Sequence, residues 1–271
     1  MAGVSADIRI MGVLNVTPDS FSDGGRYLDT GAAIEHGLAL AQQGAAIVDV
    51  GGESTRPGAA AVDLREELRR VIPVVEGLLG AGVDATISID TSKLEVARAA
   101  LDAGATFVND VTAFRAAPEL AALVAARGAE CCVMHMRGEP RTMQDAPRYA
   151  DVVGEVREFL RERVAFARQA GIAPERIVVD PGFGFGKTVE HNLELLARLD
   201  ELAVLGQPIA IGTSRKSFLG VLTGRGEHDR LAATVATNVI GLLRGASVFR
   251  VHDVAPVRDA LAVAAATVSW R

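Results

Sequence analysis

Short apolar runs rich in β-branched residues alternate with amphipathic stretches along the whole chain. The runs have the length and composition of buried strands, and the stretches repeat their apolar positions with the spacing of a helix. The sequence predicts strands at Ile8–Leu14, Ala46–Val50, Thr86–Asp90, Thr106–Asn109, Cys131–His135, Ile177–Asp180, Pro208–Gly212 and Ser247–Val251. It predicts helices that begin near Thr30, Asp63, Ser92, Pro118, Tyr149, Thr188, Lys216 and Asp253, with a further helix over 229–243.

Local signals support several of these boundaries. Asp63 with Glu66, and Ser92 with Glu95, have the spacing of a capping box, in which a short polar side chain caps the first turn of a helix. Gly104 stands where a helix would end in the left-handed conformation.

Regular alternation of strand and helix indicates parallel strands joined by right-handed crossovers. Eight such units close into a (β/α)₈ TIM barrel, which routinely contains about 250 residues. An open, doubly wound sheet is the alternative. With no linker or shift in composition, we expect residues 1–271 to form a single domain.

Polar residues stand at nearly every predicted strand end. In a barrel these ends meet at one face, where active sites lie. Each residue alone could cap a helix, but the joint pattern favours a site. The residues are Asn15, Glu53, Ser54, Thr55, Arg56, Asp90, Asn109, Asp110, His135, Asp180, Ser214, Arg215, Lys216, Arg250, His252 and Asp253.

The composition narrows the function classes. The chain has 271 residues and a formal net charge of −6, which argues against nucleic acid or an anionic membrane as its main partner. No long apolar run or signal-peptide pattern is visible, so we expect a cytoplasmic protein. The cysteines, Cys131 and Cys132, are adjacent in a predicted strand, where a disulfide between them would be strained. Core thiols in a reducing compartment are expected.

Cations among the strand-end residues predict an anion site. Lys216 and Arg250 would converge on the mouth of the barrel, Arg56 would approach from a loop, and His252 shares a strand face with Arg250. Such a set suits phosphate or pyrophosphate. Asn15 could add an oxygen ligand for Mg²⁺, which commonly binds through substrate phosphates.

Acceptors form a second group at Asp90, Asn109 and Asp180. A buried carboxylate can accept two N–H donors from an amino-pyrimidinone edge, which guanine and pterin both present. The alternative is that each is a satisfied core or capping residue.

The stretch 182–188 reads GFGFGKT and resembles part of a P-loop. The first glycine that a P-loop requires falls at Pro181, so the motif fails and we expect no nucleoside triphosphate site. The glycines instead suit a tight loop beside a ligand, with one phenylalanine ring as a stacking wall.

Taken together, these segments resemble the dihydropteroate synthase family. Eight motifs occur in order over nearly the whole chain: Met11–Gly25, Asp49–Gly58, Ser88–Thr91, Asn109–Val111, Val133–Arg137, Asp180–Lys187, Thr213–Gly220 and Arg250–Asp253. The resemblance implies the barrel fold and a transferase of folate biosynthesis. The implied reaction joins 4-aminobenzoate to 7,8-dihydropterin-6-ylmethyl diphosphate and releases diphosphate. It also implies Mg²⁺, a homodimer and inhibition by sulfonamides.

Carried over residue by residue, the family pattern implies three subsites. Pterin would bind Asp90, Asn109, Asp180 and Lys216, and diphosphate would bind Asn15, Arg56, Arg250 and His252, with Asn15 on the metal. For 4-aminobenzoate the implied contacts are Phe21, Asp23, Thr55, Arg56, Pro57, Phe185 and Ser217. Asp90, Lys216, Arg250 and His252 would be the catalytic residues.

The implied mechanism is dissociative, with carboxylates such as Asp90 stabilising a cationic pterin methylene. Two alternatives stay open. A pterin-dependent methyltransferase on the same barrel would need no diphosphate site, so Arg250, His252 and the loop residue Arg56 count against that alternative. A non-catalytic pterin-binding paralogue is the other. One departure from the family pattern is Phe114, where small residues are common.

Overall fold

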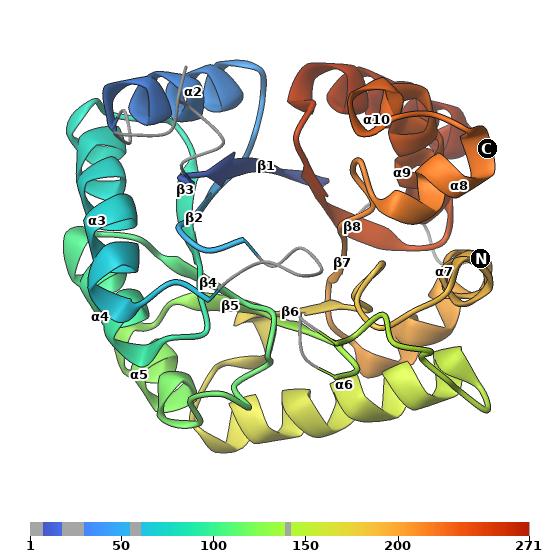
Figure 1. The fold of residues 1–271 in the computed structure, drawn as a ribbon, viewed down its shortest axis with the longest axis horizontal. Coiled ribbons are helices and arrows are strands. Elements are labelled where there is room, and N and C mark those ends of the chain that lie inside the picture. Colours follow the sequence, from blue (N-terminus) through green and yellow to red (C-terminus); the bar gives the residue numbers. More distant parts are fainter. Residues whose placement is uncertain (1–7, 18–29, 55–60, 139–141, 271) are drawn as a thin grey trace.

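Eight parallel strands close into a barrel in sequence order, and the helices surround it (Figure 1). The computed structural model describes residues 8–17, 30–54, 61–138 and 142–270. The strands are β1 (Arg9–Asn15), β2 (Ile47–Gly51), β3 (Thr86–Asp90), β4 (Phe107–Asp110), β5 (Glu130–Met134), β6 (Ile177–Asp180), β7 (Ile209–Ile211) and β8 (Ala246–Val251). The predicted (β/α)₈ fold is confirmed, and the open sheet is excluded because β1 pairs with both β2 and β8.

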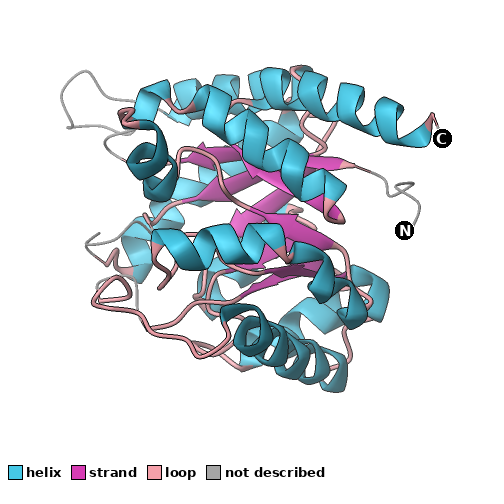
Figure 2. Cartoon of the chain, turned by 90° about the vertical axis from the view of Figure 1, so that its right-hand side faces the viewer, coloured by secondary structure: helices cyan, strands magenta, loops and turns pink. Residues whose placement is uncertain are grey.

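Helices cover the outer face of the barrel, so that the strands form an inner layer (Figure 2). They are α2 (Thr30–Gln42), α3 (Leu64–Gly80), α4 (Leu94–Ala103), α5 (Glu119–Arg127), α6 (Val152–Gln169), α7 (Val189–Ala197), α8 (Ser217–Thr223), α9 (Leu231–Leu243) and α10 (Val254–Ser269). Short 3₁₀ turns η1 (Pro174–Arg176), η2 (Leu199–Leu205) and η3 (Glu227–Asp229) complete the order. Every predicted strand and helix is present, with boundaries displaced by at most a few residues.

Two apolar layers hold the barrel together. The larger lies between the outward faces of the strands and the helices. A smaller one fills the barrel interior, with Met11, Ile47, Phe107, Cys132, Val178, Ala210 and Val248. Below it, the Arg9 guanidinium pairs with Glu130 from β5 and lies 5.9 Å from the Phe107 ring centroid. The barrel interior between these residues is therefore filled by side chains.

Capping follows the sequence at α3 but not at α4. The Asp63 side chain accepts from the Glu66 amide at 2.9 Å, as predicted. The cap predicted at Ser92 is wrong, because Lys93 occupies the N-cap position and the Thr91 hydroxyl accepts from the Lys93 amide at 3.2 Å. Gly104 ends α4 in the left-handed conformation, as expected.

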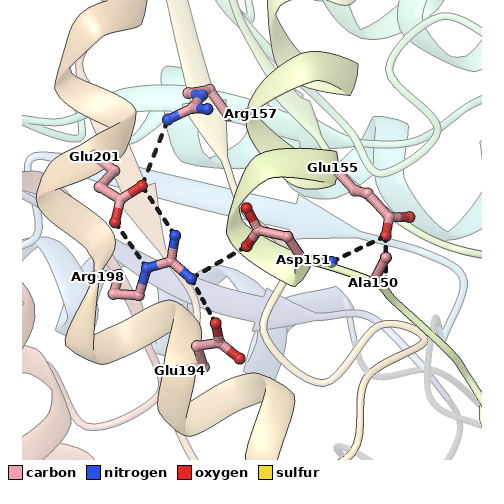
Figure 3. Close-up of polar contacts among 7 residues, drawn as sticks. All are labelled: Ala150, Asp151, Glu155, Arg157, Glu194, Arg198 and Glu201. Atoms are coloured by element: carbon pink, nitrogen blue, oxygen red, sulfur yellow. Dashed lines mark hydrogen bonds and ion pairs between the residues drawn. The ribbon is translucent and has the colours of Figure 1, made fainter.

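A surface ion-pair network joins α6 to α7 and η2 (Figure 3). Arg198 donates to Glu201 at 2.7 Å, to Asp151 at 3.1 Å and to Glu194 at 2.5 Å. Its members are solvent-exposed, so the network stabilises the packing of these helices only modestly.

The sequence led to expectations about the state of the cysteines and about membrane-spanning helices. Cys131 and Cys132 are free, buried thiols, and burial raises the pKa of both. Within the described ranges, no helix combines the length and apolarity needed to cross a membrane.

Candidate active site

A cavity of about 320 Å³ opens at the carboxyl ends of the strands. Its lining includes ten residues that the sequence predicts for the site, and these lie at or just after the carboxyl ends of β1, β2, β3, β7 and β8. They are Asn15, Glu53, Ser54, Asp90, Ser214, Arg215, Lys216, Ser217, Arg250 and His252. The structure thus brings together side chains that lie more than two hundred positions apart in the chain.

Arg250 lies between two carboxylates at the centre of this mouth. Its Nε donates to Asp49 Oδ2 and its Nη2 to Asp90 Oδ2, both at 2.7 Å. Strand register produces this arrangement, since β8 lies beside β1, and β2 and β3 follow around the barrel. Nη1 and the second N–H of Nη2 are the guanidinium donors that these two ion pairs do not use.

Asp49 is the main site residue that the sequence reasoning missed. Its side chain is fully buried and also accepts from Ser88 Oγ at 2.6 Å and from Asn109 Nδ2 at 2.9 Å. Because the amide nitrogen of Asn109 donates to Asp49, the amide oxygen is the part of this side chain that faces away from Asp49. A carboxylate inside the apolar strand Ile47–Gly51 was the signal that could have revealed it.

Burial sets the electrostatics of the mouth. It raises the pKa of Asp90, nearby Asp49 and Glu67 add to the rise, and Arg250 opposes it. Burial alone would lower the pKa of Arg250, but the charges of Asp49 and Asp90 outweigh this effect and raise it. Asp90 therefore depends on the Arg250 ion pair to remain charged.

Asp180 lies at the end of β6, next to Gly212 of the cavity lining. It is 7% exposed, and its Oδ1 accepts from the Gly182 amide at 2.7 Å. Burial raises its pKa, while that hydrogen bond and the Lys216 charge lower it. A Cβ at Gly212 would lie 3.9 Å from Asp180 Oδ2, so this carboxylate lies directly behind the glycine in the cavity wall.

Lys216 and Phe185 form the side wall. Lys216 Nζ lies 4.0 Å from the Phe185 ring centroid, a cation–π contact. Phe185 packs with Val111, Met134, Met136 and Met143 in an apolar cluster beside the cavity.

Hydrogen bonds fix the loop before α8, and with it Lys216 and Ser217, in a conformation that is strained at Arg215. Arg215 has a φ of 59°, a left-handed conformation that costs a non-glycine residue free energy. Its guanidinium pairs with Asp253 at 2.7 Å, and its amide donates to Thr234 Oγ1 at 3.1 Å. On the same side, Ser214 Oγ lies 3.0 Å from His252 Nδ1. Both strand-end segments, 214–216 and 250–253, are therefore fixed to each other.

Several predicted site residues are either outside the described ranges or outside the cavity lining. Phe21, Asp23, Thr55, Arg56 and Pro57 fall outside the described residues. Six predicted residues are described but do not line the cavity: Asn109, Asp110, His135, Asp180, Phe185 and Asp253. Asp110 accepts from the amides of Thr112 and Phe114 and so caps a turn.

Two further sequence observations now have a structural meaning. Phe114 is fully buried and packs against Phe166 of α6, with ring centroids 6.4 Å apart, so it belongs to the outer core. Lys187, the lysine of the failed P-loop pattern, is 3% exposed and contacts His135. A lysine buried in this way does not reach out to a phosphate.

The protein offers few metal ligands at the mouth of the barrel, so a metal ion there would need water and substrate oxygens to complete its coordination. No cluster of three or more His, Cys, Asp or Glu side chains able to hold a metal ion occurs in the described ranges. Asn15 presents a single amide at the cavity. Mg²⁺, which keeps several waters and binds through substrate phosphates, fits this arrangement.

Comparisons with known proteins agree with this geometry. The pterin binding enzyme family matches residues 11–252. Dihydropteroate synthase of Escherichia coli (strain K12) is 48% identical, over 98% of this chain and 95% of that protein. A solved structure of Xanthomonas albilineans dihydropteroate synthase with 4-aminobenzoic acid is 50% identical, with a TM-score of 0.90 over 97% of this chain and 94% of that chain. Another, in complex with 7,8-dihydropteroate, is 46% identical, with a TM-score of 0.86 and the same coverage. The chain therefore belongs to the pterin-binding enzymes and, within them, to the dihydropteroate synthases.

Proposed function

We propose that the barrel, acting as one domain, joins 4-aminobenzoate to 7,8-dihydropterin-6-ylmethyl diphosphate and releases diphosphate. The observation that carries this proposal is the convergence of Asp90, Arg250 and Lys216 on the cavity, with two buried carboxylates directly behind its wall: Asp49, which pairs with Arg250, and Asp180, which lies beside Gly212. Acceptors suit the donor edge of a pterin, and cations suit the diphosphate.

The pterin subsite consists of Asp180, Asn109, Asp90 and Lys216. Asp180 accepts from the amino-pyrimidinone edge, and the Asn109 amide oxygen, turned away from Asp49, accepts a further ring N–H. Support comes from the burial of both side chains, which excludes water from competing for these hydrogen bonds.

The diphosphate subsite consists of Asn15, His252 and the Nη1 side of Arg250, with Arg56 from the neighbouring loop. His252 faces Ser214, so its ring is held at the rim of the cavity. Asn15 would hold Mg²⁺, which supplies charge neutralisation of the leaving diphosphate when bound.

The 4-aminobenzoate subsite consists of Phe185 and Ser217, joined by Phe21, Asp23, Thr55, Arg56 and Pro57. Phe185 offers an apolar wall, and Ser217 lines the cavity at the start of α8.

The residues support a dissociative displacement. The bond between the pterin methylene carbon and the diphosphate oxygen breaks, and its electron pair leaves with the diphosphate. The amine nitrogen then donates its lone pair to the methylene carbon and loses a proton to water. The negative charges of Asp90 and Asp49, held in place by Arg250, stabilise the positive charge that develops on the methylene carbon. Fixed electrostatics rather than a general base therefore lowers the barrier to displacement.

We further propose a homodimer that resides in the cytoplasm. Exposed apolar side chains occur on α8 at Val221 (71% exposed) and Leu222 (51%), and on α9 at Ile240 (41%) and Leu243 (53%). Helices α8, α9 and α10 lie together on one side of the barrel (Figure 1), so a second copy could bury this face. The free thiols suit a reducing compartment.

Product formation from the two substrates tests the proposal. The protein is incubated with the pterin diphosphate and Mg²⁺, with and without 4-aminobenzoate, and both diphosphate and dihydropteroate are quantified. We expect the two products in equal amounts only when both substrates are present. Binding of pterin without any turnover would instead identify a non-catalytic paralogue.

A further inference from the structure

The loop between β6 and α7, residues 181–187, is held in shape by side chains from three neighbouring elements. Gly182 has a φ of 70°, and a Cβ there would lie 1.9 Å from the His135 carbonyl oxygen, so the loop passes directly against the end of β5. Gln144 donates to the Gly184 oxygen at 2.5 Å, and Asn192 accepts from the Gly184 amide at 2.8 Å. These contacts hold Gly182 and Gly184, and a further residue holds Phe185.

Lys187 supplies that support from inside the loop. Its Nζ lies 2.9 Å from the Gly182 oxygen, 3.1 Å from the Phe185 oxygen and 2.9 Å from His135 Nδ1. None of these partners is a carboxylate. Instead, the three contacts join the first glycine of the loop, the aromatic wall and the end of β5.

These contacts can be satisfied with Lys187 charged or neutral. An ammonium donates to both carbonyls and to an unprotonated Nδ1. A neutral amine donates to both carbonyls and accepts from Nδ1–H, so a change of His135 tautomer compensates for the lost proton. Burial lowers the pKa of Lys187 to about 7, and burial together with Lys187 lowers that of His135 to about 2, so His135 stays neutral.

We propose that Lys187 is a positioning residue for the 4-aminobenzoate subsite: with His135 it clasps the 182–185 turn so that the Phe185 ring faces Lys216. This inference rests on the proposed function and adds to it the element that holds the aromatic wall in place. Lys187 is buried and does not line the cavity, so it acts on the subsite through Gly182 and Phe185 rather than by touching substrate.

The expected consequence is a selective one. Without the clasp, the Phe185 ring loses its fixed contact with Lys216, so the 4-aminobenzoate subsite loosens. Asp180 remains held by its own hydrogen bond from the Gly182 amide and by β6, so pterin binding changes less.

Substitution of Lys187→Met tests the proposal, because methionine keeps length and apolar bulk but removes every donor. We expect the KM for 4-aminobenzoate to rise about tenfold, the scale of losing one or two hydrogen bonds, with pterin affinity changed much less. Tyr149→Phe is the matched control. It removes one hydrogen bond to the same loop, donated to the Gly186 oxygen at 2.8 Å, without touching Gly182 or Phe185.

Distinct outcomes separate the possibilities. A lower Tm with an unchanged KM in Lys187→Met, or an equal KM rise in Tyr149→Phe, would show that Lys187 only stabilises the fold, and would overturn the proposal. An unmodified protein that makes no dihydropteroate would refute the proposed function instead. If Lys187→Met does not fold, ¹⁵N NMR of the unmodified protein decides: His135 Nδ1 must be an unprotonated acceptor below about pH 6, and a proton there overturns the clasp.

Discussion

Asp49 Oδ2 accepts a hydrogen bond from Arg250 Nε at 2.7 Å, and this ion pair joins two strands that lie on either side of β1. Asp49 is fully buried, whereas the Arg250 side chain is 24% exposed, so the aspartate fixes the guanidinium at the cavity. One carboxylate with no position on the cavity surface therefore orients both Arg250 and Asn109.

Replacement of Asp49→Asn should impair both stability and turnover. The amide would present a donor to Arg250, Asn109 or Ser88, which all donate to this side chain at present. Because Arg250 keeps its pair with Asp90, we expect a loss of about 2–3 kcal/mol in the free energy of unfolding. Urea denaturation measures it. Retention of wild-type stability and pterin affinity would show that Asp49 does not organise the site.

Replacement of Asp180→Asn should weaken pterin binding. Half of the amide edge is a donor and would face the donors of the amino-pyrimidinone. Leaving buried donors unpaired costs about 1–3 kcal/mol, equivalent to about five- to 150-fold in affinity. Calorimetric titration with a pterin checks this, and unchanged affinity in a folded variant contradicts the assignment.

Replacement of Lys216→Ala should lower turnover by about a hundredfold, the scale of losing one electrostatic contact in a site shielded from water. The ammonium lies on the Phe185 ring and near Asp180, so it is held between the pterin and aminobenzoate subsites. Steady-state kinetics with both substrates give the comparison. Near-normal kcat would reduce Lys216 to a packing role.

Lys187 should make stability depend on pH in a defined window. The folded protein releases its proton near a pKa of about 7, whereas the unfolded chain keeps it up to the ordinary value of 10.5. Between these values the unfolded state binds more protons, so the free energy of unfolding rises with pH, by at most about 1.4 kcal/mol per pH unit. Asp180, Lys216 and Arg137 are the charged groups whose fields act on this ammonium.

Denaturation of the wild type and of Lys187→Met from about pH 6 to about pH 9 isolates this contribution, since other ionisations are common to both proteins. The wild type should gain stability relative to the variant as the pH rises. A constant difference between the two curves would mean that Lys187 keeps its proton throughout.

The fold was predictable because its strands are short, apolar and regularly spaced. Thr86–Asp90 and Ile177–Asp180 coincide with the predicted strands, and Asn15 and Arg250 reach the same mouth by barrel closure alone. Local capping was less predictable. The hydroxyl of Thr91 rather than that of Ser92 accepts from the amide of Lys93 at the start of α4, because the path of the backbone decides which hydroxyl faces this amide.

Long-range pairing limited the prediction of the site. Asp49 was missed since its partners, Ser88, Asn109 and Arg250, become neighbours only when the barrel closes. The sequence predicts that Lys187 is not a P-loop lysine, but it could not predict the contact with His135, which depends on how closely the loop follows β5.

A secondary deuterium isotope effect at the pterin methylene tests the proposed carboxylate-stabilised displacement most directly. The protein is mixed in excess with pterin diphosphate carrying either CH₂ or CD₂ at that carbon, in the presence of 4-aminobenzoate and Mg²⁺, and a single turnover is followed. If Asp90 and Asp49 stabilise a cationic methylene, the carbon becomes trigonal before the amine bonds, so the CH₂ substrate reacts measurably faster. Equal rates in a turnover limited by chemistry would show that the amine displaces diphosphate directly, and would contradict the role assigned to the buried carboxylates.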